Sequence, residues 1–203
     1  MADQRGKRDE ILSKISFSIQ EKIIVESIDI SGVDLTFSDF SELMANRMTA
    51  TGTKLRASSL INASFRDSDF SSADIRKCNL ENIDIADCFF KDANFNESTM
   101  KFAKIKISFC EKACFDQVDL TNGDLYDTIF NGSTFRSANL TDVKAKYASF
   151  KGVDLSGANL TNGNFEGANF ISSKLDGVIW TGANIIGARF DEGVLEKIKS
   201  ELK

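Results

Sequence analysis

The sequence predicts an all-β solenoid, and three observations lead to this fold class. Every fifth residue from Ile30 to Phe190 gives 33 positions, and all 33 are apolar. The positions two residues earlier, from Ile28 to Ala188, are Ala, Ser, Thr, Val, Gly or Cys in 29 of 33 cases. No insertion or deletion shifts the phase, and the chain contains no proline. A period of five fits neither the helix, at about 3.6, nor the strand, at about 2, so the backbone must turn a corner in every repeat.

Corners at this spacing turn two columns of side chains inward and leave three positions facing outward. Four five-residue sides close a square coil of about 20 residues, and stacked coils pair through backbone hydrogen bonds at about 4.8 Å. The 33 repeats therefore predict about eight coils and a rod roughly 39 Å long. Nine of the 13 glycines lie two residues after a central residue, which indicates corners with positive φ.

The repeat Ala-Asp/Asn-Leu/Phe-x-x resembles that of the pentapeptide-repeat family. The match covers residues 28–192, and three segments carry it almost verbatim: SGANL (156–160), EGANF (166–170) and TGANI (181–185). In the middle of the chain the phase persists without the consensus, as in FAKIK (102–106). The resemblance implies a right-handed quadrilateral β-helix, to which we assign residues 28–190.

Composition limits the classes of function. A formal net charge of −5 favours neither direct nucleic-acid binding nor a membrane surface. No apolar run approaches the length of a transmembrane helix and no signal-peptide pattern opens the chain, so a cytoplasmic location is the default expectation. The chain has no histidine, the commonest general base, and a convex rod provides no cleft. We therefore expect neither enzymatic activity nor a cofactor.

The four cysteines have a structural interpretation. Cys78, Cys88 and Cys110 fall in the inward columns, and Cys114 points outward. A Cys₂His₂ zinc site is excluded because the chain has no histidine. The inward cysteines are interpreted as small apolar core residues.

Residues 1–27 are assigned to a polar, frayed start followed by a capping helix. Asp9 is suited to begin this helix, which should run to about Glu21. Ile11, Ile15 and Ile19 form its apolar stripe. Because an open solenoid end exposes unpaired sheet edges, we expect this helix to cover the N-terminal end.

Residues 191–203 are assigned to a second helix, with Asp191 as its cap. Two interpretations of its apolar face remain open. The face either seals the final coil or contacts a copy of itself, as the resemblance implies, because a C-terminal element joins two rods in quinolone-resistance members. The residues of this end contact are Val194, Leu195, Ile198 and Leu202.

The outward columns predict an apolar patch in the middle of the rod, with lysines at its rim. These large side chains stand where the repeat usually has Asp, Asn, Ser or Gly, and exposed apolar patches with polar rims often mark partner surfaces. The alternative is that they stack only on one another along the outer face. The predicted patch comprises Phe89, Lys104, Lys106, Ile107, Phe109, Tyr126, Ile129 and Tyr147.

Two functions remain after these exclusions. The first is a non-catalytic scaffold for protein–protein interaction, whose partner the sequence does not identify. The second follows from the resemblance, because family members that protect DNA gyrase are acidic rods that mimic duplex DNA. Residues 28–190 carry 21 acidic and 17 basic side chains. Their net charge of −4 compares with about 22 phosphate charges on a duplex of equal length, so the scaffold is favoured.

Overall fold

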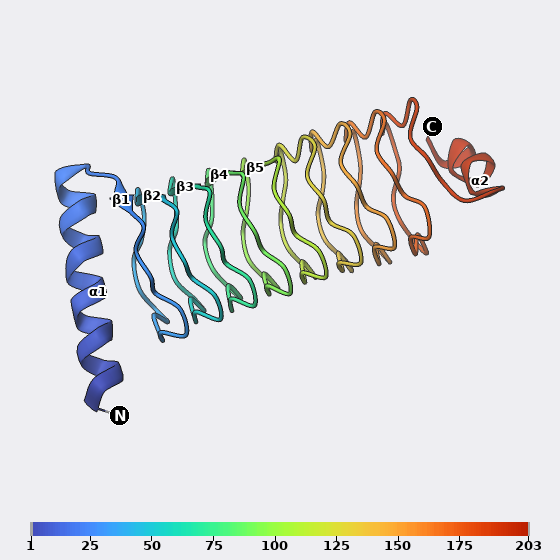
Figure 1. Cartoon of the computed structure of the whole chain (residues 1–203). Coiled ribbons are helices and arrows are strands. Elements are labelled where there is room, and N and C mark those ends of the chain that lie inside the picture. The colour runs from blue at the N-terminus through green and yellow to red at the C-terminus, as the bar shows by residue number, and fades with distance from the viewer. Residues whose placement is uncertain (1, 203) are drawn as a thin grey trace.

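The computed structural model describes residues 2–202, and the side chains of residues 5–199 and 202. Two residues lie outside the described ones: Met1, the first residue of the predicted N-terminal segment, and Lys203, the last residue of the predicted C-terminal segment. The chain forms a rod of stacked coils with one helix at each end (Figure 1). In chain order the elements are α1 (Ala2–Glu21), β1 (Val25–Glu26), β2 (Met44–Asn46), β3 (Ser64–Arg66), β4 (Asp84–Ala86), β5 (Lys104–Lys106) and α2 (Val194–Glu201).

The coils pair in parallel, and each residue aligns with the one 20 positions later. Strands β1 to β5 form one sheet in sequential order, in which Ala45 pairs with Phe65 and Phe65 with Ile85. Isolated parallel bridges continue the same register along the rod, as far as Asn169 with Arg189. The fold is therefore a β-solenoid, as the five-residue period predicts.

Every repeat turns through a tight corner that requires a left-handed backbone. At the corner after Ile30 the N–H of Val33 donates to the carbonyl of Ile30 at 3.2 Å, and Gly32 between them has φ 65°. The nine corner glycines all have positive φ, which confirms the prediction from their spacing. Non-glycine residues adopt the same conformation at the remaining corners, among them Ile107 with φ 51°.

The Asp or Asn before each central residue stabilises the corner that follows it. The carboxylate of Asp34 accepts hydrogen bonds from the hydroxyl of Thr36 at 2.8 Å and from its N–H at 3.2 Å. Asn164 accepts a hydrogen bond from the N–H of Glu166 in the same way, at 3.1 Å. These local bonds between a side chain and the backbone two residues later are a physical reason for Asp and Asn in the repeat.

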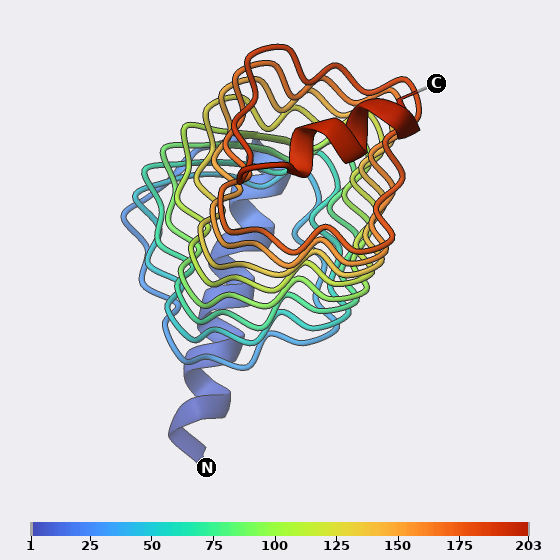
Figure 2. The same ribbon diagram turned by 90° about the vertical axis from the view of Figure 1, so that its right-hand side faces the viewer.

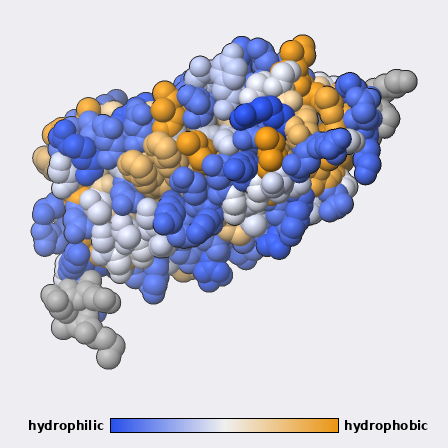
Figure 3. All heavy atoms as spheres, turned by 45° about the vertical axis from the view of Figure 1, so that its right-hand side comes forward, coloured by the Kyte–Doolittle hydropathy of each residue, from blue (hydrophilic) through white to orange (hydrophobic). Residues whose placement is uncertain are grey.

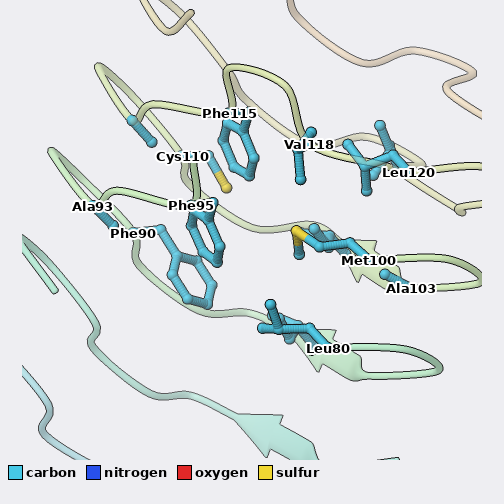
Figure 4. Close-up of a cluster of buried hydrophobic side chains, with 14 of the residues drawn as sticks. Leu80, Phe90, Ala93, Phe95, Met100, Ala103, Cys110, Phe115, Val118 and Leu120 are labelled. Carbon is cyan, nitrogen blue, oxygen red and sulfur yellow. The ribbon is translucent and has the colours of Figure 1, made fainter. Parts of the chain in front are cut away.

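The interior consists of stacked apolar columns (Figure 4). Phe130 is fully buried, and its ring stacks on Phe150 at a centroid distance of 5.3 Å and an interplanar angle of 14°. Thr53 in the smaller column donates through Oγ1 to the carbonyl of Ile30 at 2.8 Å, whereas Oγ of Ser38 in the same column is buried without a hydrogen-bond partner among the described residues. The core thus combines aromatic stacking with hydrogen-bonded hydroxyl groups.

Helix α1 begins earlier than the sequence analysis predicts. It starts at Ala2, so residues 2–8 are helical, and Asp9 lies within the helix instead of capping it. Tertiary contacts explain the difference, because the side chain of Arg8 donates through Nε to the carbonyl of Asp34 at 2.9 Å. Within its apolar stripe, Ile11 and Ile15 are buried in the core and Ile19 is partly buried against it.

Helix α2 begins at Val194, and Gly193 occupies the N-cap position without a side-chain hydrogen bond. The prediction that Asp191 caps this helix is therefore wrong. Its carboxylate instead accepts a hydrogen bond from the N–H of Ser172 at 2.9 Å, a donor on the open edge of the solenoid. Satisfying that edge takes the side chain away from the helix.

Replacing Phe130 by alanine should lower the free energy of unfolding by about 3–5 kcal/mol, because a fully buried ring is deleted from a packed column. Denaturant unfolding measures this loss. Phe102→Ala provides a control, since Phe102 is 48% exposed and should lose far less. A loss below about 1 kcal/mol for Phe130→Ala would contradict the inward packing.

Acid should weaken the corners that contain aspartate. Hydrogen bonds from Thr36, first from its side chain and then from its backbone, lower the pKa of Asp34 below the ordinary 3.8. The pKa values of Asp29 and Asp39 are lowered by Ser31 and Ser41 in the same way. The pKa of each of these carboxyl groups is lower in the folded protein than in the unfolded chain. The stabilisation is therefore complete at a pH above the unfolded-state pKa, and it is lost as the pH falls through the folded-state pKa.

Asparagine retains the acceptor oxygen without titrating, so the triple variant Asp29→Asn, Asp34→Asn and Asp39→Asn should lose less stability on acidification than the parent. Urea unfolding at about pH 7 and about pH 3 tests this expectation. An equal loss in both proteins would show that these corners do not contribute to acid sensitivity.

Candidate protein-interaction surface

The predicted mid-rod residues gather around one corner of the solenoid and extend onto both adjoining sides. One column contains Phe89, Phe109 and Ile129, which occupy successive bridges of the ladder. Ile107 and Tyr147 lie at the corner, two coils apart. Four of these five side chains are exposed large hydrophobic residues, with Phe89 at 48% and Ile107 at 49%, while Ile129 is half-buried.

Aromatic contacts fix the orientation of the exposed rings. Phe89 and Phe109 stack with a centroid distance of 5.2 Å and an interplanar angle of 9°. Tyr126 meets Tyr147 edge to face at 6.0 Å. The ring of Tyr147 also lies over the backbone of Gly167, where a Cβ atom would come within 2.6 Å of Cδ1. The exposed rings are thus held in place by their neighbours.

The lysines at the rim differ in their contacts. Lys106 pairs with Asp124 at 2.8 Å, whereas Lys104 is exposed and forms no ion pair within residues 5–199. Lys146 pairs with Glu166 at 2.9 Å, and its Nζ lies 4.9 Å from the centroid of the Tyr147 ring. The rim therefore contains both neutralised and available positive charges.

The patch residues replace side chains that would stabilise the corners better. Phe89, Phe109 and Ile129 occupy the position from which Asp or Asn accepts a corner N–H elsewhere, and they have no acceptor. Ile107 is a β-branched residue at φ 51°, a conformation in which such residues are genuine outliers. Fold stability alone does not account for these residues.

Other exposed apolar side chains were not selected from the sequence. Phe37 is 82% and Phe102 is 48% exposed, and both lie at corners with positive φ. Their position two residues after a central residue could have identified them, since the same position identifies Ile107. The hydrophobic side chains visible in Figure 3 form separate islands among hydrophilic ones.

The cysteines provide no reactive centre in the core. Burial raises the pKa of the Cys78 thiol to about 11 and that of Cys88 to about 12, and it raises the pKa of Cys110 well above its ordinary value. Their thiolate forms are therefore suppressed near neutral pH. Cys114 is half-buried, and its Sγ lies 3.0 Å from Oγ1 of Thr134. Over the described residues, no group of three or more His, Cys, Asp or Glu side chains could hold a metal ion.

The predicted end contact lies on α2, which crosses the open end of the last coil (Figure 2). Ile198 is 4% exposed and lines a shared cleft with Leu175 and Trp180. Val194 and Leu202 are partly buried against the same core, and Leu195 is half-buried. Much of the apolar stripe is thus covered within a single chain, which favours sealing of the coil over contact with a second rod.

Replacing Ile198 by aspartate should lower the melting temperature, because it buries an unpaired carboxylate against the last coil. The mass measured by light scattering should remain that of one chain. Ile186→Asp is the matched control, since Ile186 is 74% exposed near the same end. A halved mass would instead support the end-to-end dimer, and no change in either quantity would contradict both interpretations of the helix.

The ladder, corners and stacked interior define the class of protein as a repeat β-solenoid. A family model described as pentapeptide repeats matches eight copies, over residues 51–85, 113–146, 148–179 and 164–197. The chain therefore belongs to the pentapeptide-repeat family, as its sequence repeat suggests. A search of curated proteins found no match.

A comparison with solved structures supports the same fold through one match. A structure of QnrB1, a plasmid-mediated fluoroquinolone resistance protein, is 21% identical with a TM-score of 0.53, and the match covers 88% of this chain and 87% of QnrB1. HetL, a pentapeptide repeat protein involved in heterocyst differentiation regulation from the cyanobacterium Nostoc sp. strain PCC 7120, is 19% identical with a TM-score of 0.37, over 83% of this chain and 91% of HetL. The likeness to QnrB1 supports the solenoid fold and carries no conclusion about function.

Within residues 2–202, neither helix has the length and apolar character needed to cross a membrane.

Proposed function

We propose that this chain is a non-catalytic scaffold whose mid-rod patch binds a protein partner. The observation that carries the proposal is the stacked pair Phe89 and Phe109, which remains 48% and 36% exposed at positions where other repeats have a corner-stabilising Asp or Asn. The scaffold has the form that the family resemblance implies, a right-handed quadrilateral β-helix of about eight coils, and the 20-residue register supports it.

The surface has the properties of a binding site. Large aromatic side chains are common anchors of interfaces. Because Phe89, Phe109 and Tyr147 are already held by stacking and by the Gly167 backbone, binding would immobilise few rotamers. Lys104 supplies an exposed positive charge at the rim, where charges mainly set orientation and the rate of association.

DNA mimicry of the gyrase-protecting kind has weaker support. Many carboxylates of the rod are engaged locally, either at corners, as Asp34 is, or with cations, as Asp116 is with Arg136 at 2.6 Å. The net charge of −4 over residues 28–190 is far below that of duplex DNA. A gyrase supercoiling assay with and without a quinolone separates the two functions, since the scaffold is expected to change neither result.

The double variant Phe89→Asn, Phe109→Asn should weaken partner binding or self-association while leaving the melting temperature nearly unchanged. Asparagine supplies the acceptor that the corner N–H groups of Lys91 and Glu111 lack, which offsets the lost stacking. Binding is measured by affinity capture from the source cells followed by titration of the captured partner, and self-association by light scattering.

The matched control is Phe102→Asn, which removes an exposed aromatic side chain elsewhere on the rod. A large loss of stability in the double variant would show that the two rings serve the fold. Unchanged association would remove the patch as a binding site.

A further inference from the structure

A second surface lies at the N-terminal end and is separate from the mid-rod patch. A groove of about 540 Å³ runs between α1 and the segment that contains β1. Three large apolar side chains line it and are strongly exposed: Phe17 at 61%, Ile23 at 51% and Ile24 at 46%. Figure 1 shows α1 lying across the end of the rod next to β1.

One wall of this groove is an unpaired sheet edge. Strand β1 is the outermost strand of its sheet and pairs only with β2. In the ladder the N–H of Ser27 donates to the carbonyl of Asn46, so the alternation along the strand directs the peptide groups of Ile24 and Glu26 away from β2. These groups face the position that a preceding coil would occupy.

The chain closes comparable edges elsewhere with its own groups. Arg8 donates to the carbonyl of Asp34 on another side of the first coil. At the opposite end, Asp191 accepts from the N–H of Ser172, and the carbonyl of Leu202 accepts from the N–H of Gly182. Along the β1 edge no backbone partner of Ile24 or Glu26 is found among residues 2–202. An open edge flanked by exposed apolar side chains is a template for an added strand.

The width and charge of the groove indicate which kind of ligand fits it. Because α1 forms the opposite wall, the groove has room for a single chain and not for the coil of a second rod. Of the charged side chains that line the groove, Glu26 pairs with Arg47 at 2.8 Å and Glu10 with Lys14 at 2.6 Å, while Lys7 and Asp29 carry opposite charges. An uncharged, apolar segment therefore fits this groove better than a charged one.

We infer that this groove binds an extended apolar segment of a partner protein, which adds a strand to β1 and packs its side chains against Phe17, Ile23 and Ile24. Backbone hydrogen bonds to Ile24 and Glu26 provide the affinity, and the apolar wall provides the selectivity, as in other cases of strand addition.

A displayed library of random seven-residue peptides, selected on the full chain, tests this inference. Peptides rich in alternating apolar residues should be enriched. Their dissociation constants should rise at least tenfold with Phe17→Asp and with Ile24→Asp, and stay unchanged with the control Ile186→Asp at the other end. Binding should also slow hydrogen exchange at the amides of Ile24 and Glu26, and N-methylation of alternate peptide bonds in the ligand should weaken binding at least tenfold.

Several results would overturn the inference. They are the absence of any enriched peptide, equal affinity for the parent and both groove variants, and insensitivity to N-methylation. If the parent had twice the mass of one chain and the Ile24→Asp variant had the mass of one chain, the edge would bind a second copy of the chain instead. Circular dichroism and melting temperature confirm that each variant is folded.

Discussion

The structure depends on one constraint, the left-handed corner that recurs every five residues and brings each residue into register with the one 20 positions later. The backbone can form the ladder only if every corner turns the chain by the same amount. Ala45 then meets Phe65, and their side chains extend the same inward column. A single missed corner would move all later inward residues out of phase, and the repeat contains no insertion between Ile30 and Phe190.

This constraint separates the demands on the interior from those on the surface. Inward positions must be apolar or provide a hydroxyl that reaches a carbonyl, as Thr53 does. Outward positions have more freedom, and their commonest role is the corner hydrogen bond that Asp34 accepts. Where Phe89 and Phe109 replace that residue, the ladder persists while the surface changes from polar to aromatic. A solenoid can thus acquire a binding surface without a change of fold.

The ends of the rod face a different problem, because a solenoid exposes unpaired backbone groups at its first and last coils. Helices cover the apolar interior at both ends, and Ile15 of α1 and Ile198 of α2 are buried against it. Side chains such as Arg8 and Asp191 satisfy individual edge groups. Within the described part of the chain, neither the terminal helices nor these side chains pair with the backbone edge at Ile24. Covering the apolar core and pairing the sheet edges are therefore achieved by different residues in this chain.

The sequence by itself determined the solenoid, the phase of every inward residue and the apolar character of the mid-rod patch. It could do so because the period is local and each repeat contributes the same side-chain directions. It did not determine where α1 begins or what Asp191 does, since both depend on contacts with residues distant in the sequence. Only the tertiary structure revealed the groove lined by Phe17 and Ile24, because this groove forms between α1 and the β1 edge, which come together only when the chain folds.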